Sequence, residues 1–310
     1  MQTLWLTHPS CIAHENEVGN PEVPARLEII EAAATERGLL ARVEQRLPAP
    51  SATREQLRRA HTSEHVEAIF AAAPADGRVH LDGDTSMMPA TLDAALHAAG
   101  AAVAAVDEVL GGRAEAAFCN VRPPGHHAER AKAMGFCLFN NIAVAALHAV
   151  HAHGLNRVAV FDFDVHHGNG TEHILADCQD PQLLMCSLYQ SPLYPYQVAA
   201  NIPGRMVNVP LRPGAGGAAL REAWDREWAP ALRAHAPELL LISAGFDAHR
   251  RDPLGGLSFE ESDYAWLTSA LAGLSREVGA RGVVSALEGG YDLQALASSA
   301  CAHVAALLDA

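Results

Sequence analysis

The stretch RVAVFDFDVHHGNG, residues 157–170, decides how the rest of the sequence is interpreted. It begins with the apolar, β-branched run of a buried strand and ends in polar residues and glycines. Asp162, Asp164 and His166 follow at intervals of two, so an extended strand would direct their side chains to one face. Charged groups at the end of an apolar strand cost free energy unless they are paired or bind a metal. Taken alone, the stretch indicates either an ion-pair cluster or a metal site.

Outward from this stretch, further apolar runs alternate with Ala- and Leu-rich segments of helical period. This alternation predicts an α/β fold with a mostly parallel central sheet and helices on both faces. We expect residues 1–310 to form a single catalytic domain. The predicted strands are 116–120, 157–163, 183–188, 238–243 and 282–287, the predicted helices are 24–40, 89–110, 139–153, 217–235, 259–278 and 293–308, and 192–217 is expected to be an irregular rim loop.

Composition narrows the class of protein. A hydrophobic fraction of 49% in 310 residues suffices for a large core, and a net charge of -14 argues against a nucleic-acid partner. The six cysteines are scattered without a Cys-x-x-Cys pair, which is typical of a reducing compartment. The start lacks the pattern of a signal peptide, and no apolar run is long enough to span a bilayer. We therefore expect a cytoplasmic protein with no membrane partner, and a homo-oligomer is left open.

A second strand end adds a third metal-ligating side chain. Residues 238–256, ELLLISAGFDAHRRDPLGG, run apolar to Ser243 and then place Asp247 just past the strand. In parallel sheets ligands bind beyond the carboxyl ends of the strands. A set of Asp164, His166 and Asp247 would leave an open coordination position, as in catalytic zinc sites. By itself, Asp247 could equally be a helix cap or a turn residue.

Two more strand ends carry groups suited to acyl-transfer chemistry. Residues 120–141, NVRPPGHHAERAKAMGFCLFNN, present His126 and His127 after a Pro-Pro-Gly turn, which suits proton transfer. Residues 283–293, VVSALEGGYDL, place Tyr291 after a Gly-Gly turn, where its hydroxyl could stabilise an oxyanion. Each has an ordinary structural alternative, but the agreement of four strand ends favours one active site.

These four motifs resemble the zinc-dependent histone deacetylase, acetoin-utilisation and acetylpolyamine amidohydrolase family. Asn169 in HHGNG and Glu288 in LEGGY are similar to its class II branch. The resemblance implies an arginase-deacetylase fold with Asp164, His166 and Asp247 as zinc ligands. Iron(II) could replace zinc in the cell.

The resemblance also implies the roles of five residues. His127 would be the general base and then the general acid, and His126 an electrostatic catalyst and proton partner. Asp162 would orient His126, and Asn169 would hydrogen-bond His127. Tyr291 would bind the oxyanion.

Substrate and potassium sites follow from the same resemblance. Gly135 and Phe136 would line an acyl-amine channel, with Tyr194 on the opposite wall. Position 254 holds a glutamate gatekeeper in polyamine-selective class II relatives, whereas this chain has Leu254. Asp84 would contact substrate from a rim loop, or act as a turn residue. A structural K⁺ would use Asp162 and Ser187, together with Asp164 and His166.

The predicted function is hydrolysis of an acyl-amine amide, such as acetyl-lysine, to free amine and acetate. Alternatives are an acetylpolyamine or other small acyl-amide hydrolase, a non-catalytic acyl-amine binding protein, and an arginase-like dinuclear manganese hydrolase. The chain departs from the family at the rim, because Asn20-Pro21-Glu22 replaces the usual His-Pro-Glu and the glycine-rich loop after Pro195 is missing.

Overall fold

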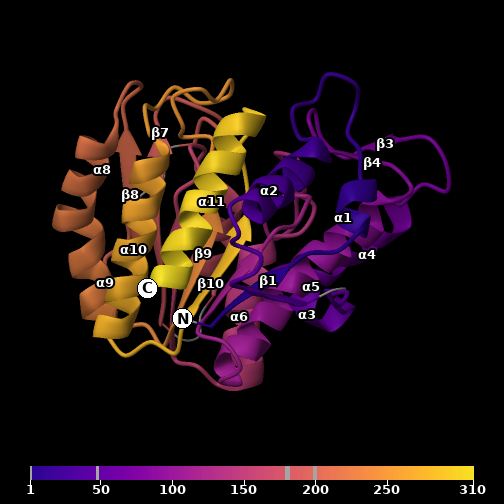
Figure 1. The fold of residues 1–310 in the computed structure, drawn as a ribbon. Coiled ribbons are helices and arrows are strands. Elements are labelled where there is room, and N and C mark those ends of the chain that lie inside the picture. The colour runs from indigo at the N-terminus through magenta and orange to yellow at the C-terminus, as the bar shows by residue number, and fades with distance from the viewer. Residues whose placement is uncertain (1, 47–48, 179–181, 198–200) are drawn as a thin grey trace.

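One parallel sheet forms the centre of the molecule (Figure 1). The computed structural model describes residues 2–46, 49–178, 182–197 and 201–310. Within these ranges, eight strands pair in the order β2-β1-β5-β10-β9-β6-β7-β8, and every neighbouring pair is parallel. The strands are β1 (Thr3–Leu6), β2 (Glu44–Arg46), β5 (Ala116–Cys119), β6 (Arg157–Asp162), β7 (Gln182–Gln190), β8 (Met206–Leu211), β9 (Leu239–Ala244) and β10 (Val283–Leu287), and β3 (Val79–His80) pairs with β4 (Ser86–Met87) in a separate antiparallel hairpin.

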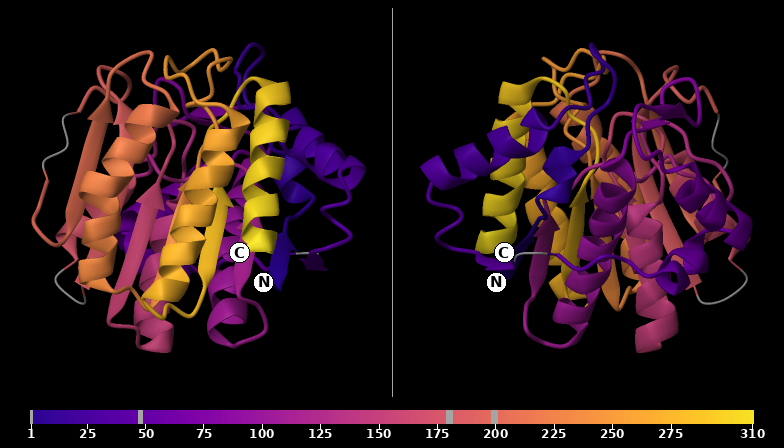
Figure 2. Two further views of the ribbon diagram at one scale, coloured as in Figure 1. Left: turned by 60° about the vertical axis from the view of Figure 1, so that its left-hand side comes forward. Right: turned by 90° about the vertical axis from the view of Figure 1, so that its right-hand side faces the viewer.

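Helices cover both faces of the sheet. In Figure 2, α10 and α11 lie in front of the strands in the left view, and α5 and α6 lie on the opposite face. A π-helical turn, Trp224–Trp228, joins α8 to α9. The helices are α1 (Ser10–Ala13), α2 (Ala25–Glu36), α3 (Arg54–Ala60), α4 (Ser63–Ala72), α5 (Thr91–Leu110), α6 (Asn141–His153), α7 (Asn169–Asp177), α8 (Gly217–Ala223), α9 (Ala229–His235), α10 (Glu261–Glu277) and α11 (Leu293–Asp309).

The central strands are apolar because both of their faces are covered. Every residue of β9, LLLISA, is buried, and β5 and β10 are buried along their whole length. Such continuous apolar runs are typical of parallel strands between two helix layers. No helix in the part of the chain that the structure describes is long and apolar enough to cross a membrane.

The predicted fold class is confirmed, and all five predicted strands are present. The expectation for residues 192–217 was wrong in part, because β8 lies within them and forms the edge of the sheet. Its buried residues alternate with more exposed ones, and Pro210 lies in it, so it lacks the continuous apolar run of a central strand. The N-terminal strands β1 and β2 were not predicted either.

The order of strands places the four motifs together. The four strands that precede them, β5, β10, β9 and β6, are consecutive neighbours in the sheet. Because all pairs are parallel, their carboxyl ends lie at the same edge. The loops after these strands therefore meet there, as the sequence predicts.

Candidate active site

A pocket of about 230 Å³ opens where the four loops meet. Residues from all four motifs and from two rim loops line it. The lining consists of Asp84, Pro124, His126, His127, Gly135, Phe136, His166, Leu193, Tyr194, Leu254, Gly289 and Tyr291.

Three buried side chains with metal-ligating atoms lie close together, and one of them, His166, lines this pocket. Asp164, His166 and Asp247 each offer one such atom, and these atoms lie within 4.8 Å of one another. The Nδ1 atom of His166 lies 3.1 Å from Oδ1 of Asp164 and 3.1 Å from Oδ2 of Asp247. Two carboxylates and one imidazole are donors that Zn²⁺ accepts, and three protein ligands leave one position for a reactant. The residues therefore fit a catalytic divalent metal ion.

The side chains of this triad converge through turns and not through strand alternation. Strand β6 ends at Asp162, so Asp164 and His166 lie beyond it and the expected extended geometry was wrong. Instead, the Asp164 amide donates to Oδ1 of Asp162 (3.0 Å), and the His166 amide donates to Oδ1 of Asp164 (2.9 Å). Such side-chain bonds to the backbone two residues on are typical of Asx turns. Each aspartate thus shapes the chain that carries the next ligand.

The charges of the triad depend on one another. Burial lowers the pKa of His166, but hydrogen bonds to Asp164 and Asp247 outweigh it and raise that pKa to about 10. Burial and the charge of Asp164 raise the pKa of Asp247 to about 7. Two carboxylates so close together without water need a positive partner, which a proton or a metal ion can supply.

His126 and His127 lie side by side, with ring centroids 4.0 Å apart. The Nδ1 atom of His126 lies 3.0 Å from Oδ2 of Asp162. Burial lowers the pKa of His126, but the charges of Asp164 and Asp162 raise it well above its usual value. Burial and the neighbouring imidazoles of His126 and His166 hold the pKa of His127 well below its usual value. The pair therefore combines a charged and a neutral imidazole.

The hydrogen bonds of Asn169 set the tautomer of His127. The amide group of Asn169 donates to Oε1 of Glu129 (2.8 Å), so its carbonyl oxygen Oδ1 faces Nδ1 of His127 at 2.8 Å. Nδ1 is then the donor, and Nε2 of the neutral ring carries a free lone pair. A base with its lone pair on Nε2 is what proton abstraction requires.

Tyr291 is held by a carboxylate and by a guanidinium group. Its amide donates to Oδ2 of Asp252 (2.6 Å), and Arg26 lies over its ring, 5.0 Å from the centroid. Arg26 also donates to the carbonyl of Gly290 (2.7 Å). Burial raises the pKa of Tyr291 well above its usual value, so the phenol stays protonated and can donate a hydrogen bond.

Aromatic residues form the walls of the pocket. Phe136, with φ of 66°, and Tyr291 have ring centroids 6.2 Å apart, and Tyr194 stands perpendicular to His127 at 5.0 Å. Leu254 lies at the mouth with 36% of its surface exposed. Oδ1 of Asp84 accepts a hydrogen bond from the Gly135 amide (2.9 Å). Asp84 thus both lines the pocket and supports the turn that carries Phe136.

Two glycines allow the metal-ligating carboxylates to approach the backbone. A Cβ atom at Gly245 would lie 2.0 Å from Oδ2 of Asp164, and one at Gly289 would lie 2.1 Å from Oδ2 of Asp247. The Gly289 amide also donates to Oδ2 of Asp164 (2.8 Å). No other residue type leaves room for these carboxylates.

The expected potassium residues lie on neighbouring strands. Asp162 and Ser187 are partners in the register of β6 and β7, and both are fully buried. Asp162 already accepts from His126 and from the Asp164 amide, and the Ser187 hydroxyl donates to the carbonyl of Leu188 (3.2 Å).

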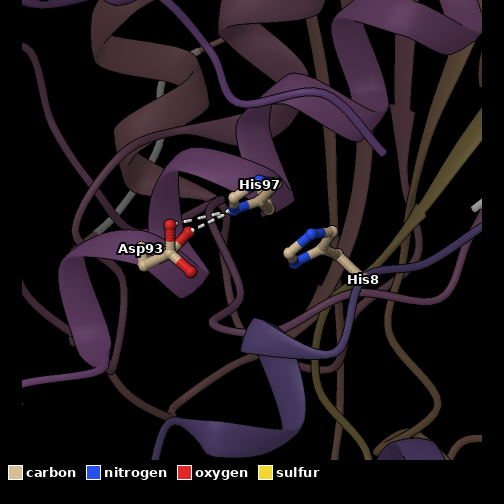
Figure 3. Close-up of side chains that lie close together, drawn as sticks. All are labelled: His8, Asp93 and His97. Atoms are coloured by element: carbon tan, nitrogen blue, oxygen red, sulfur yellow. Dashed lines mark hydrogen bonds and ion pairs between the residues drawn. The ribbon is translucent and has the colours of Figure 1, made fainter. Parts of the chain in front are cut away.

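A group formed by His8, Asp93 and His97 lies outside the pocket, and His97 is paired with Asp93 within it (Figure 3). The ring of His97 faces the carbonyl of Asp93 (2.8 Å) and its carboxylate (3.3 Å). The ring of His8 stacks on His97 at 3.5 Å, and its Nδ1 accepts from the Ser10 amide (3.1 Å).

A second group outside the pocket joins α5 to α6. Oδ1 of Asp107 lies 2.7 Å from Nε2 of His148 and 2.6 Å from Nε2 of His153. Arg59 contacts the other ring nitrogen of His148. Both ring nitrogens of His148, and Nε2 of His153, are thus paired within the protein.

The sequence did not indicate the buried charges beneath the site. Glu22 is fully buried and pairs with Arg26 (3.0 Å) and Arg122, which also binds the carbonyls of Cys11 and His14. The sequence pattern marked only Glu22 among these residues, within the departure at 20–22. Asp252 lies within the motif at 238–256 and Glu288 within that at 283–293, but the sequence pattern indicated no role in the site for either residue.

Known proteins similar to this chain agree in one family. A family model described as "Histone deacetylase domain" matches residues 20–307. The chain is 39% identical over 295 residues to the histone deacetylase-like amidohydrolase of Pseudomonas aeruginosa, covering 93% of this chain and 75% of that protein. It is 37% identical over 305 residues to the polyamine deacetylase HDAC10 of Homo sapiens, and the match covers 93% of this chain and 44% of that protein. The solved structure titled "Crystal Structure of HDA15 HD domain" matches with a TM-score of 0.91 and 34% identity, covering 99% of this chain and 90% of that chain.

Proposed function

The chain belongs to the histone deacetylase family and is an amidohydrolase that cleaves amide C–N bonds, and from this premise we propose that it removes acyl groups from lysine-like amines with Zn²⁺ as its metal. The products are acetate and the free amine. One observation carries the proposal: the donor atoms of Asp164, His166 and Asp247 lie within 4.8 Å of one another, and His166 lines the same pocket as His127 and Tyr291.

Members of the family depend on a metal ion, and Asp164, His166 and Asp247 would hold it here. Bound Zn²⁺ supplies a Lewis acid that polarises a carbonyl and makes water a stronger acid. The same imidazole and carboxylate donors also suit iron(II), which is the alternative metal in the cell.

The two histidines divide the proton chemistry. His127 is neutral with a free lone pair on Nε2, so it takes the proton of the attacking water and later delivers it to the leaving amine. His126 is held charged by Asp162 and Asp164, so it stabilises negative charge that develops nearby. Asn169 and Asp162 act by orienting these rings.

Tyr291 stabilises the oxyanion of the tetrahedral intermediate. Its phenol is protonated, and Tyr291 lines the same pocket as the histidines. Asp252 and Arg26 hold its backbone and ring in place before the substrate arrives. A donor that is already oriented needs no reorganisation during the reaction.

The walls of the pocket favour a long, narrow acyl-amine. Gly135, Phe136 and Tyr194 would flank the methylene chain, and Leu254 offers an apolar surface at the mouth. An apolar residue at this position gives a secondary ammonium group no charged partner, which favours acyl-lysine over an acetylpolyamine. Asp84 at the rim is the residue that would contact the substrate backbone or amine.

A potassium ion and a cytoplasmic location complete the proposal. Asp162 and Ser187 offer the oxygen donors that such a hard cation prefers. All six cysteines are free thiols, as is typical of a reducing compartment.

The test is a substrate panel with the purified, zinc-loaded protein. Acetyl-lysine peptides and acetylated polyamines are compared at equal concentrations, and the metal-stripped protein and the Asp247→Ala variant serve as controls. We expect peptide turnover that metal removal abolishes and zinc restores. Turnover of polyamines alone would establish the alternative substrate class. Binding of acetyl-lysine without hydrolysis of either substrate would refute the proposed enzymatic activity.

A further inference from the structure

Glu288 follows β10, is fully buried and does not line the pocket, and the proposed chemistry assigns it no role. We propose that Glu288 is a positioning residue that fixes the loop of the tandem histidines and so aims His126 at Asp162. This inference rests on the proposed function, because it assigns His126 to the active site.

Both oxygens of the Glu288 carboxylate are engaged. Oε2 accepts hydrogen bonds from the amides of Gly125 (2.7 Å) and His126 (3.1 Å). Oε1 accepts one from the hydroxyl of Ser243 (3.1 Å) at the end of β9. A carboxylate can accept from several donors at once, which a neutral, shorter side chain here could not do.

The hydrogen bonds of Glu288 act directly on His126, whose ring has the proposed electrostatic role. The His126 amide donates a hydrogen bond to Glu288, and the Nδ1 atom of the same residue lies 3.0 Å from Oδ2 of Asp162. Gly125 cannot move away, since even a Cβ atom there would lie 2.4 Å from the Asn141 amide. With the backbone anchored at two successive amides, the ring has one orientation toward Asp162.

The backbone of Glu288 is anchored as well, so it is a fixed support. Its amide donates to the carbonyl of Ala244 on β9 (3.0 Å), and Arg26 donates to its carbonyl. Arg26 also lies over the ring of Tyr291, three residues further along. Glu288 therefore ties the histidine loop to the turn of the proposed oxyanion donor, and the two groups keep a fixed separation.

The decisive comparison is between Glu288→Met and Glu288→Gln. Methionine fills a similar volume but accepts none of the three hydrogen bonds, whereas glutamine can keep its oxygen toward the two amides and donate to Ser243. We expect kcat to fall about 10- to 100-fold in Glu288→Met at nearly unchanged KM. Glu288→Gln should recover most of this loss, because position and not charge is what Glu288 supplies.

A double-mutant cycle tests whether the effect passes through His126. In a His126→Ala background, Glu288→Met should change kcat less than about twofold, because the positioned ring is gone. Independent, multiplying losses would overturn the proposal, and so would a raised KM with normal kcat. Where Glu288→Met does not fold, Glu288→Asp replaces it, since the shorter side chain withdraws the oxygens but keeps a carboxylate.

The matched control is Asp263→Leu on α10. Asp263 is also a buried carboxylate that binds a backbone amide, that of Glu260 (3.0 Å), and pairs with Arg221 (2.9 Å), but it lies outside the pocket. This variant should retain the kcat of the natural protein. If Asp263→Leu lowers kcat as much as Glu288→Met does, the loss is general and the proposal fails.

A measurement without turnover separates this proposal from the proposed function. The imidazole ¹⁵N signals of the metal-free protein, assigned with a His126→Gln variant, report the surroundings of the His126 ring. They should shift in Glu288→Met, stay in Glu288→Gln, and stay in Asp263→Leu. Unmoved signals in Glu288→Met would refute the positioning role even if the protein hydrolyses amides, whereas shifted signals without any hydrolysis would leave only the proposed function refuted.

Discussion

His303 and His126 are both buried, yet the fold keeps the ring of His303 neutral and gives that of His126 a positive charge. His303 lies on α11 against the sheet, where its ring nitrogens face the hydroxyls of Thr268 (2.6 Å) and Ser285 (2.8 Å). Burial there lowers its pKa to about 3. His126 lies at the carboxyl edge of the sheet, where the charges of Asp164 and Asp162 outweigh burial and raise its pKa well above the usual value.

The comparison shows that partners, and not burial, decide what a buried histidine can do. Hydroxyl partners satisfy a neutral ring and give it a structural role. Carboxylate partners make the ring a cation and leave the pocket beside it reactive. At the carboxyl edge of the sheet, turns bring the carboxylates of Asp162 and Asp164 to His126.

The largest effect on kcat should come from substituting His127, the neutral histidine at the carboxyl edge of the sheet. His127→Ala removes the proposed base, so kcat should fall about 10²- to 10⁴-fold while bound zinc stays near one equivalent per chain. Steady-state kinetics and metal analysis check this. His151→Ala, at an exposed position of α6, should keep full activity. Equal rates for the two variants would mean that the edge histidines have no special role.

The next effect tests Tyr291, the proposed oxyanion donor. Tyr291→Phe removes one hydroxyl, so we expect kcat to fall about 10²- to 10³-fold with little change in KM, since the oxyanion forms only as water attacks and is absent from the bound substrate. Zinc content should not change. A variant that turns over normally would leave the oxyanion without its proposed donor.

A smaller loss of kcat should follow when the ring of His127 is kept but its hydrogen-bond partner is removed. Asn169→Ala deletes the acceptor of His127 Nδ1, so kcat should fall about 10- to 100-fold. The acidic limb of the pH–rate profile, which protonation of the base His127 produces, should also move to lower pH, because the hydrogen bond to Asn169 raises the pKa of His127. An unaltered profile together with unaltered kcat would contradict the role given to this hydrogen bond.

His303, which lies outside the pocket, should affect the stability of the fold and not the activity. The folded-state pKa of His303 is about 3, below its unfolded value of 6.5, so the unfolded state binds the proton first as pH falls. Its contribution to stability is complete above pH 6.5 and decreases toward pH 3. Relative to His303→Gln, the natural protein should lose roughly 3 kcal/mol of unfolding free energy between pH 6.5 and pH 4. Chemical denaturation at several pH values measures this, and parallel curves for the two proteins would contradict it.

The sequence predicted what depends on local pattern. Continuous apolar runs identified β5, β6, β7, β9 and β10, and the polar residues after them identified the edge where the pocket lies. It failed at β8, where burial alternates and Pro210 interrupts the pattern of a central strand. It also attributed the convergence of Asp164 and His166 to a strand, although side-chain bonds to backbone amides produce it.

Contacts between distant segments could not be read from the sequence. Glu22 and Arg122 are separated by 100 residues and lie together only because β1 and β5 are neighbours in the sheet. Glu288 was visible as part of LEGGY, but its bonds to Gly125 and His126 depend on the order of β5 and β10. Local pattern thus identified the reacting groups, and tertiary contacts supplied their supports.

The glycines against the two metal-ligating carboxylates limit how this enzyme can vary. Gly245 and Gly289 leave so little room that any side chain would push Asp164 or Asp247 aside. A saturation mutagenesis library should therefore show these two chemically inert positions to be as intolerant as the ligands themselves. The exposed mouth position Leu254 has no such constraint, so substrate preference can be altered there without moving the ligands.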